Sequence, residues 1–223
     1  KNFGVEEMFG FHGQHKDTIE DTLDPGLRRR LRDAFTLKPD DIILDCGAFL
    51  GFGDLRVSRD TPLGHIYAVE ADTDCHRLLQ RNITENGIDN VSSVHRAVWN
   101  CETELELESD FAQANSLVQD IHQGSYTQKV RTISVDGAVT HFGMSKMDML
   151  SLTLNGAEVE ALQDAEYTLR TLRPRIRIAG WYSRDNRKIW EITKEILEPY
   201  GYEVIVGNRG NLLALPEKDA ASE

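Results

Sequence analysis

Short apolar runs alternate with helical segments along most of the chain, and this alternation limits the fold more than any other feature. The runs occupy residues 42–44, 65–70, 91–98, 147–154 and 175–179. The segments with helical patterns are 53–59, 73–86, 157–172 and 187–200. Strands joined by helices need right-handed crossovers and form a mainly parallel sheet with helices on both faces. We therefore expect a Rossmann-like α/β fold that ends in an antiparallel hairpin, 202–206 with 211–215.

A single domain is the simplest organisation for the 223 residues, because no repeat or low-complexity linker divides them. Residues 1–36 are expected to be an irregular arm followed by a helix that packs on the core. Residues 37–217 are expected to form the Rossmann-like domain, and 218–223 a disordered tail. In the middle of the domain, 103–107 and 129–135 have the patterns of two further strands.

The charge balance limits the partners of this chain. Its 25 Lys and Arg against 37 Asp and Glu give a net charge of −12, which argues against binding to nucleic acid or to an anionic membrane surface. The sequence also lacks the run of about 18 apolar residues that a spanning helix needs. Three widely spaced cysteines without a C-x-x-C motif predict neither disulfides nor a zinc site, so a cytoplasmic protein without a metal is expected.

The first apolar run ends in a glycine-rich turn, Asp45-x-Gly47-x-x-x-Gly51-x-Gly53. In parallel sheets, ligands bind beyond the carboxyl ends of the strands, so this turn is a candidate binding site. It has no lysine, which excludes a phosphate-binding loop, and its glycine spacing differs from that of dinucleotide sites. Asp45 would repel a pyrophosphate but would pair with an ammonium group. These features favour S-adenosylmethionine as the cofactor.

A second acid strengthens this interpretation. Glu70 ends the second run, 23 residues after Gly47, where a carboxylate can accept hydrogen bonds from both ribose hydroxyls. The end of the third run, at Arg96, Ala97 and Val98, either contacts the adenine ring or is an ordinary strand end. Both interpretations remain open from the sequence.

Three segments resemble the FkbM-type group of class I S-adenosylmethionine-dependent methyltransferases. They are DIILDCGAFLGFGDL, IYAVEAD and MDMLSLTLNGAEVEALQDAEYTLRTLRPRIRI. The most specific part is Gly156-Ala157-Glu158 with Leu162 and Arg173-Pro174, and the likeness spans about residues 40–206. The resemblance implies O-methylation of a hydroxyl group on a sugar, a polyketide-like compound or another small metabolite, and it leaves a homodimer open. The cofactor site that we expect contains Asp45, Gly47, Ala48, Phe49, Gly51, Glu70, Ala71, Arg96, Ala97 and Val98.

The fourth run departs from the family pattern. Where the family has Lys, Asp and Glu, this chain has Ser151, Thr153 and Asn155, so a carboxylate-held metal and a carboxylate base at 155 are not expected. The candidate catalytic residues are Asn155, Glu158 and Tyr182, although Glu158 also suits a purely structural place in the first turn of a helix. Two alternative functions are a non-catalytic methyltransferase-like binding module and, on weaker grounds, a nicotinamide-dependent oxidoreductase.

Overall fold

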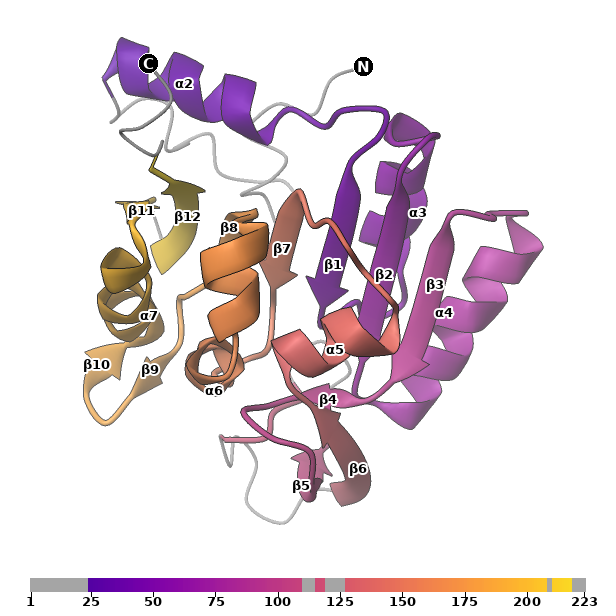
Figure 1. The fold of residues 1–223 in the computed structure, drawn as a ribbon. Helices are drawn as coiled ribbons and strands as arrows, with labels where there is room; N and C mark the ends of the chain where they lie inside the picture. Colours follow the sequence, from indigo (N-terminus) through magenta and orange to yellow (C-terminus); the bar gives the residue numbers. More distant parts are fainter. Residues whose placement is uncertain (1–23, 110–114, 119–126, 208–209, 218–223) are drawn as a thin grey trace, which may run out of the picture.

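A mainly parallel sheet forms the centre of the computed structural model, which describes residues 24–109, 115–118, 127–207 and 210–217 (Figure 1). The expected arm and tail, within 1–23 and 218–223, lie outside these residues. Among the described residues the sheet has seven strands, in the order β11 (Tyr202–Val206), β12 (Asn211–Pro216), β8 (Arg175–Ala179), β7 (Met149–Leu152), β1 (Ile42–Cys46), β2 (His65–Glu70) and β3 (Val91–His95). The expected α/β class is confirmed.

The strand directions define the two ends of this sheet. Strands β3, β2, β1, β7 and β8 are parallel neighbours, and β12 is antiparallel to both β8 and β11. The expected hairpin is therefore present, but its second strand lies inside the sheet and β11 forms the edge. The chain runs outward from β1 through β2 to β3 and returns to the other side of β1 as β7. The strand order reverses between β1 and β7, where ligand sites of such sheets lie.

Helices cover both faces of the sheet (Figure 1). One face carries α2 (Pro25–Phe35), α3 (Phe52–Asp60) and α4 (Thr73–Glu85), and the other carries α5 (Val135–His141), α6 (Glu158–Gln163), the π-helix η3 (Thr168–Leu172) and α7 (Ile189–Leu197). A 3-10 turn, η4 (Glu198–Tyr200), follows α7. Two apolar clusters fill these layers: Leu31 and Phe35 of α2 pack with Ile43 on the first face, and Leu150 packs with α5 and α6 on the second.

A small second sheet corrects the expected third strand. The main-sheet strand β3 stops at His95, because β2 ends at Glu70 and offers no partner beyond that point. The chain continues as β4 (Ala97–Val98), which pairs with β6 (Thr127–Ile133), and β6 also pairs with β5 (Glu104–Glu108). The prediction of one strand over 91–98 was wrong at Arg96, where the chain passes from one sheet to the other.

The expected helix over 157–172 is also interrupted. The carboxylate of Asp136 in α5 accepts hydrogen bonds from the backbone N–H groups of Tyr167 and Thr168, at 2.8 and 2.9 Å. This carboxylate acts as a cap supplied from another helix, so a new helical segment begins there instead of a continuation of α6. The apolar spacing is nonetheless that of a buried face, because Leu162 and Leu169 are both in the core.

The sequence patterns did not predict two short elements. Helix α5 begins at Val135, after Ser134, whose hydroxyl caps the helix by accepting from the N–H of Gly137. A tight hairpin, β9 (Ser183–Arg184) with β10 (Arg187–Lys188), follows β8. No helix within the described ranges is long and apolar enough to cross a lipid bilayer.

Candidate active site

The glycine turn after β1 is shaped by contact with the turn after β7. Gly47 has a φ of +89°, and a Cβ atom there would lie 2.1 Å from the carbonyl oxygen of Thr153. Its N–H donates to the carbonyl oxygen of Val69 at the end of β2. Only glycine fits this position, so backbone atoms alone fill the space where the ends of β1, β2 and β7 meet.

The second glycine positions helix α3, and the third has no such constraint. Gly51 is the N-cap of α3 with a φ of +74°, and a Cβ atom there would lie 2.1 Å from Cδ1 of Leu79 in α4. Gly53 lies inside α3, and a Cβ atom there would meet nothing within 4 Å. The turn therefore requires glycine at the first two positions only.

Glu70 joins the exits of β1 and β2. Its Oε2 accepts a hydrogen bond of 2.6 Å from the N–H of Phe49, and its Oε1 accepts one of 2.8 Å from the N–H of Asp72. The side chain is 8% exposed, and this burial raises its pKa to about 7, although the backbone hydrogen bonds oppose the shift. Each carboxylate oxygen keeps acceptor capacity for one further donor.

Two more of the expected cofactor residues flank this acid. Ala48 is buried against Ala68 and Leu79, and its N–H donates to Val69, as that of Gly47 does. Ala71 is partly buried against the small sheet. The residues expected at the exits of β1 and β2 therefore lie together, as their strand positions required.

Asp45 lies in a row of polar side chains that crosses three strands. It is the register partner of Ser151 on β7, which in turn is the partner of Arg177 on β8. Nη1 of Arg177 donates to Oγ of Ser151 at 3.3 Å. Burial lowers the pKa of Arg177, and the nearby charge of Asp45 acts in the opposite direction.

Asp54, in the first turn of α3, is a buried acid to which the sequence analysis gave no role. It is 3% exposed and lies close to Asp45, and its Oδ2 has no hydrogen-bond partner. Burial raises its pKa well above the usual range, and the charges of Asp45 and Glu70 add to the shift. Its place directly after the glycine turn was the available sequence signal.

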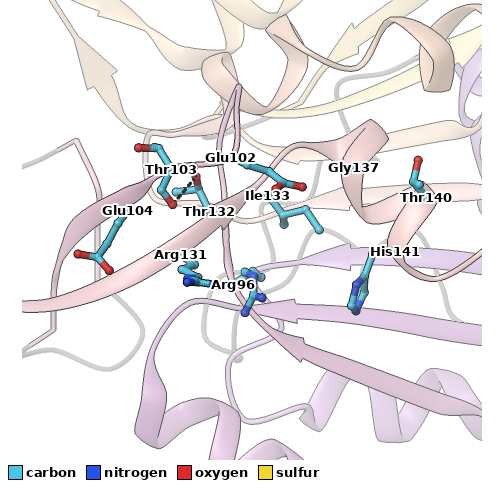
Figure 2. Close-up of a pocket in the computed structure, with 10 residues that line it drawn as sticks. All are labelled: Arg96, Glu102, Thr103, Glu104, Arg131, Thr132, Ile133, Gly137, Thr140 and His141. Atoms are coloured by element: carbon cyan, nitrogen blue, oxygen red, sulfur yellow. Dashed lines mark hydrogen bonds between the residues drawn. The ribbon is translucent and has the colours of Figure 1, made fainter.

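The residues expected near adenine differ in what they expose: Arg96 contacts Glu70 through its backbone, and the side chains of Ala97 and Val98 lie in the core. The N–H of Arg96 donates to the carbonyl oxygen of Glu70 at 3.0 Å. The side chains of Ala97 and Val98 are buried in two different apolar clusters, so only their backbone can face a ligand. The side chain of Arg96 extends into a separate open pocket of about 700 Å³ between the small sheet and α5, where Arg131 and Glu102 also lie (Figure 2).

A further acid missed by the sequence analysis holds the small sheet against this edge. Oδ1 of Asp72 accepts from the N–H groups of Asp74 and Cys75 at the start of α4. Its Oδ2 accepts from three side chains of the neighbouring segments, Ser109, Asn115 and Gln128. Burial acts to raise the pKa of Asp72, but these hydrogen bonds outweigh it and lower the pKa.

Two of the three expected catalytic residues are in contact at the exits of β7 and β8. The hydroxyl of Tyr182 donates a 3.0 Å hydrogen bond to Oδ1 of Asn155, whose Nδ2 donates to the carbonyl oxygen of Asn115. Asn155 has a φ of +52°, in the left-handed region that asparagine tolerates better than most residues. Burial raises the pKa of Tyr182, so its phenol is neutral at physiological pH.

Glu158 lies beside this pair but faces the backbone. It is fully buried, and its two oxygens accept from the N–H groups of Leu154 and Gly156, at 2.8 and 2.9 Å. Burial raises its pKa to about 7 against the effect of these bonds. These two hydrogen bonds show that Glu158 stabilises the turn that contains Asn155.

The β9–β10 hairpin is fastened to the same turn. Nη1 of Arg184 donates to both oxygens of Glu160 at 2.7 Å, and to the carbonyl oxygen of Gly156 at 3.4 Å. The arginine thereby connects the segment after β8 to the start of α6. Tyr182 enters this segment two residues earlier, so its position depends on the hairpin.

Comparisons with known proteins agree with this geometry. The family model described as the methyltransferase FkbM domain matches residues 45–204. A solved FkbM methyltransferase from Methylobacillus flagellatus KT is 16% identical, with a TM-score of 0.57 over 82% of this chain and 46% of that one. This chain thus spans about half the length of that structure. The precorrin-6y C5,15-methyltransferase from Geobacter metallireducens GS-15 is 14% identical, with a TM-score of 0.54 over 92% of this chain and 94% of that one. No curated protein matches the sequence.

Proposed function

Because the chain belongs to the FkbM methyltransferase domain family, we propose that it transfers a methyl group from S-adenosylmethionine to a hydroxyl group of a small metabolite or sugar. The observation that carries the proposal is the position of Glu70, whose carboxylate is hydrogen-bonded to Phe49 in the glycine turn. Two backbone N–H groups orient its carboxylate, and both oxygens retain acceptor capacity where a ribose would present its hydroxyls.

The exits of β1 and β2 fit such a cofactor in two further respects. At Gly47 the carbonyl oxygen of Thr153 lies where a Cβ atom would be, so the turns after β1 and β7 meet at the carboxyl ends of the strands with no side chain between them. The carboxyl group of Asp45 offers a place for an ammonium group and would repel a pyrophosphate. This acid is the reason to prefer S-adenosylmethionine over a nicotinamide dinucleotide.

Bound S-adenosylmethionine supplies a methyl group that its sulfonium already activates, so the protein has mainly to align the acceptor oxygen. We assign that alignment to Asn155 and Tyr182. The tyrosine hydroxyl donates to Asn155 and keeps lone pairs that can accept a hydrogen bond from the acceptor hydroxyl. Since its pKa is raised, Tyr182 acts as a neutral orienting group. Glu158 holds the turn in shape without touching the acceptor.

The uncharged side chains of β7 and the turn after it favour a second candidate function. Ser151, Thr153 and Asn155 stand where the family pattern has charged residues, so the chain would bind the cofactor without turning it over. This non-catalytic module shares the cofactor site and differs only at the acceptor side.

Two measurements separate these functions. Calorimetric titration with S-adenosylhomocysteine and with NAD should show binding of S-adenosylhomocysteine alone. At one hundred times its dissociation constant, S-adenosylhomocysteine should also raise the free energy of unfolding by about 2.7 kcal/mol. Incubation with methyl-labelled S-adenosylmethionine and a pool of hydroxylated metabolites should then label a product. Binding without any labelled product would favour the non-catalytic module, and preference for NAD would contradict the proposal.

A further inference from the structure

A second pocket lies between the small sheet and α5, apart from the exits of β1 and β2 (Figure 2). It is open to solvent and has a volume of about 700 Å³, which is in the range of small-molecule sites. Its walls come from the start of β5, the end of β6 and helix α5. Of the residues that line it, only Arg96 was also expected at the cofactor site, where its backbone N–H donates to Glu70. The pocket therefore presents its own set of side chains to a ligand.

Two arginine side chains give this pocket a local positive charge. Arg96 and Arg131 both line it, and His141 adds an imidazole at the end of α5. Figure 2 shows these three side chains along one side of the pocket. Nη1 of Arg96 donates to the carbonyl oxygen of His95 at 2.8 Å, and this neutral acceptor leaves the guanidinium charge unbalanced. In a chain with a net charge of −12, such a cluster is a local exception.

The pairing of β5 with β6 leaves Arg131 without the carboxylate opposite it. Glu104 is the register partner of Arg131 on the neighbouring strand, where a pair of opposite charges is favourable. The carboxylate of Glu104 lies instead 3.3 Å from Nζ of Lys129, two residues away on β6. Among the residues that the structure describes, neither Arg131 nor Arg96 forms an ion pair. Both guanidinium groups therefore keep N–H donors for a ligand.

The same pocket offers an acceptor for hydroxyl groups. The carboxylate of Glu102 lines it beside α5, where Oε1 lies 4.0 Å from the place of a Cβ atom at Gly137. Glu102 is exposed, and its carboxylate has no hydrogen-bond partner among the described side chains. A carboxylate only accepts hydrogen bonds, so it suits ligand hydroxyls and repels a second anionic group. The lining thus fits a hydroxylated molecule with one anionic group.

We propose that this pocket binds a small hydroxylated metabolite through a phosphate or carboxylate group. Arg96 and Arg131 hold the anionic group by charge-assisted hydrogen bonds, and Glu102 accepts from hydroxyl groups of the same molecule. A volume of about 700 Å³ accommodates a sugar phosphate or a sugar acid. This site goes beyond the proposed function and does not depend on it, because the cofactor site uses only the backbone of Arg96.

The test is calorimetric titration of the whole protein, without added cofactor, with glucose 6-phosphate, glucuronate, glucose and inorganic phosphate as probes. We expect at least one of the two sugar anions to bind, and glucose not to bind at the same concentrations, because glucose lacks the group that the arginines hold. Binding of glucose 6-phosphate alone would assign the site to phosphate, and binding of glucuronate alone would assign it to carboxylate. The affinity should fall as salt is added, because ions screen charges in an open pocket.

Variants locate the bound anion. Arg96→Gln and Arg131→Gln should each weaken its binding by about tenfold or more, because each removes a charged donor. Arg81→Gln, at an exposed arginine of α4 that pairs with Glu85, is the matched control and should bind as the unmodified protein does. Glu102→Ala should weaken binding of the sugar anion but not of inorganic phosphate. Urea denaturation checks that each variant is folded, and Arg131, which is exposed, should tolerate its substitution.

Three outcomes would overturn this assignment. The first is that neither sugar anion binds to the unmodified protein. The second is that either arginine variant leaves the binding unchanged, which would place the ligand elsewhere. The third is that inorganic phosphate binds as tightly as the sugar anions, which would contradict a hydroxylated ligand. The binding of S-adenosylhomocysteine is measured separately, so failure of this site and failure of the proposed function are distinguishable.

Discussion

The N–H of Phe49 donates a 2.6 Å hydrogen bond to Oε2 of Glu70, and this bond links the turns that follow the first two strands. Phe49 has a φ of +55°, a conformation that a non-glycine residue adopts only where its surroundings require it. Glu70 thus stabilises the conformation of the glycine turn and also has free acceptor capacity for a ligand. A substitution at Glu70 should therefore affect both the turn and ligand binding.

Replacement of Glu70 should weaken cofactor binding. Glu70→Ala removes a charged acceptor and should cost about 1.5–3 kcal/mol of binding free energy for S-adenosylhomocysteine. Calorimetric titration measures this loss, and the exposed acid Glu106 supplies the control variant Glu106→Gln, which should bind normally. An unchanged dissociation constant in Glu70→Ala would rule out the ribose role.

The glycines of the turn should differ in their tolerance of alanine. Gly47→Ala places a Cβ atom against the carbonyl oxygen of Thr153 at positive φ and should lower the free energy of unfolding by about 2–4 kcal/mol. Gly53→Ala lies in α3 in open space and should raise it by about 0.5–1 kcal/mol. Urea denaturation of both variants provides the comparison. Equal effects of the two substitutions would contradict the described turn.

The hydrogen bond between Tyr182 and Asn155 should appear as a coupling energy. In a double-mutant cycle, Tyr182→Phe and Asn155→Gly should couple by about 0.5–1.5 kcal/mol in the free energy of unfolding. Glycine keeps the backbone conformation at position 155, and Tyr167→Phe, at an exposed tyrosine elsewhere, should show no coupling. Binding of S-adenosylhomocysteine should stay within a few tenths of a kcal/mol of the unmodified value. A coupling near zero would mean that the two side chains do not meet in solution.

Stability should fall as the pH rises from 5 to 8. Burial raises the pKa of Glu70 and Glu158 to about 7 in the folded protein, so the folded state holds protons that the unfolded chain has released. The stabilisation is complete below the unfolded pKa and is lost as the pH passes the folded value, by up to about 3 kcal/mol for each group. Urea denaturation across this range measures the loss.

The variant Glu158→Gln cannot titrate at this position, so its stability should fall less steeply over the same range. Glu106→Gln, at an exposed position, serves as the matched control with the slope of the unmodified protein. Identical slopes in all three proteins would show that Glu158 does not titrate in this range.

The sequence was most informative where local pattern and tertiary structure agree. Strand β2 matches the expected run over 65–70, and Glu70 stands at its end as predicted, because a buried parallel strand is both apolar and sharply bounded. The spacing of Gly47 and Gly51 likewise predicted the turn that follows β1. Such signals depend on few neighbours, so they can be read from one chain.

The failures came from contacts that connect distant segments. The strand predicted over 91–98 divides because β2 has ended beside it, and the helix predicted over 157–172 divides because Asp136 caps it from α5. Asp54 was overlooked for the same reason. An acid in the first turn of a helix is ordinary, and only its burial beside Asp45 distinguishes it.

The position of β12 has a consequence for biosynthesis. This strand follows both β8 and β11 in the chain but lies between them in the sheet. Until residues 211–216 emerge from the ribosome, β8 ends in an unpaired edge and β11 has nowhere to dock. Exposed strand edges are sites of unwanted pairing, so this edge of the nascent chain is open to such pairing until β12 is inserted.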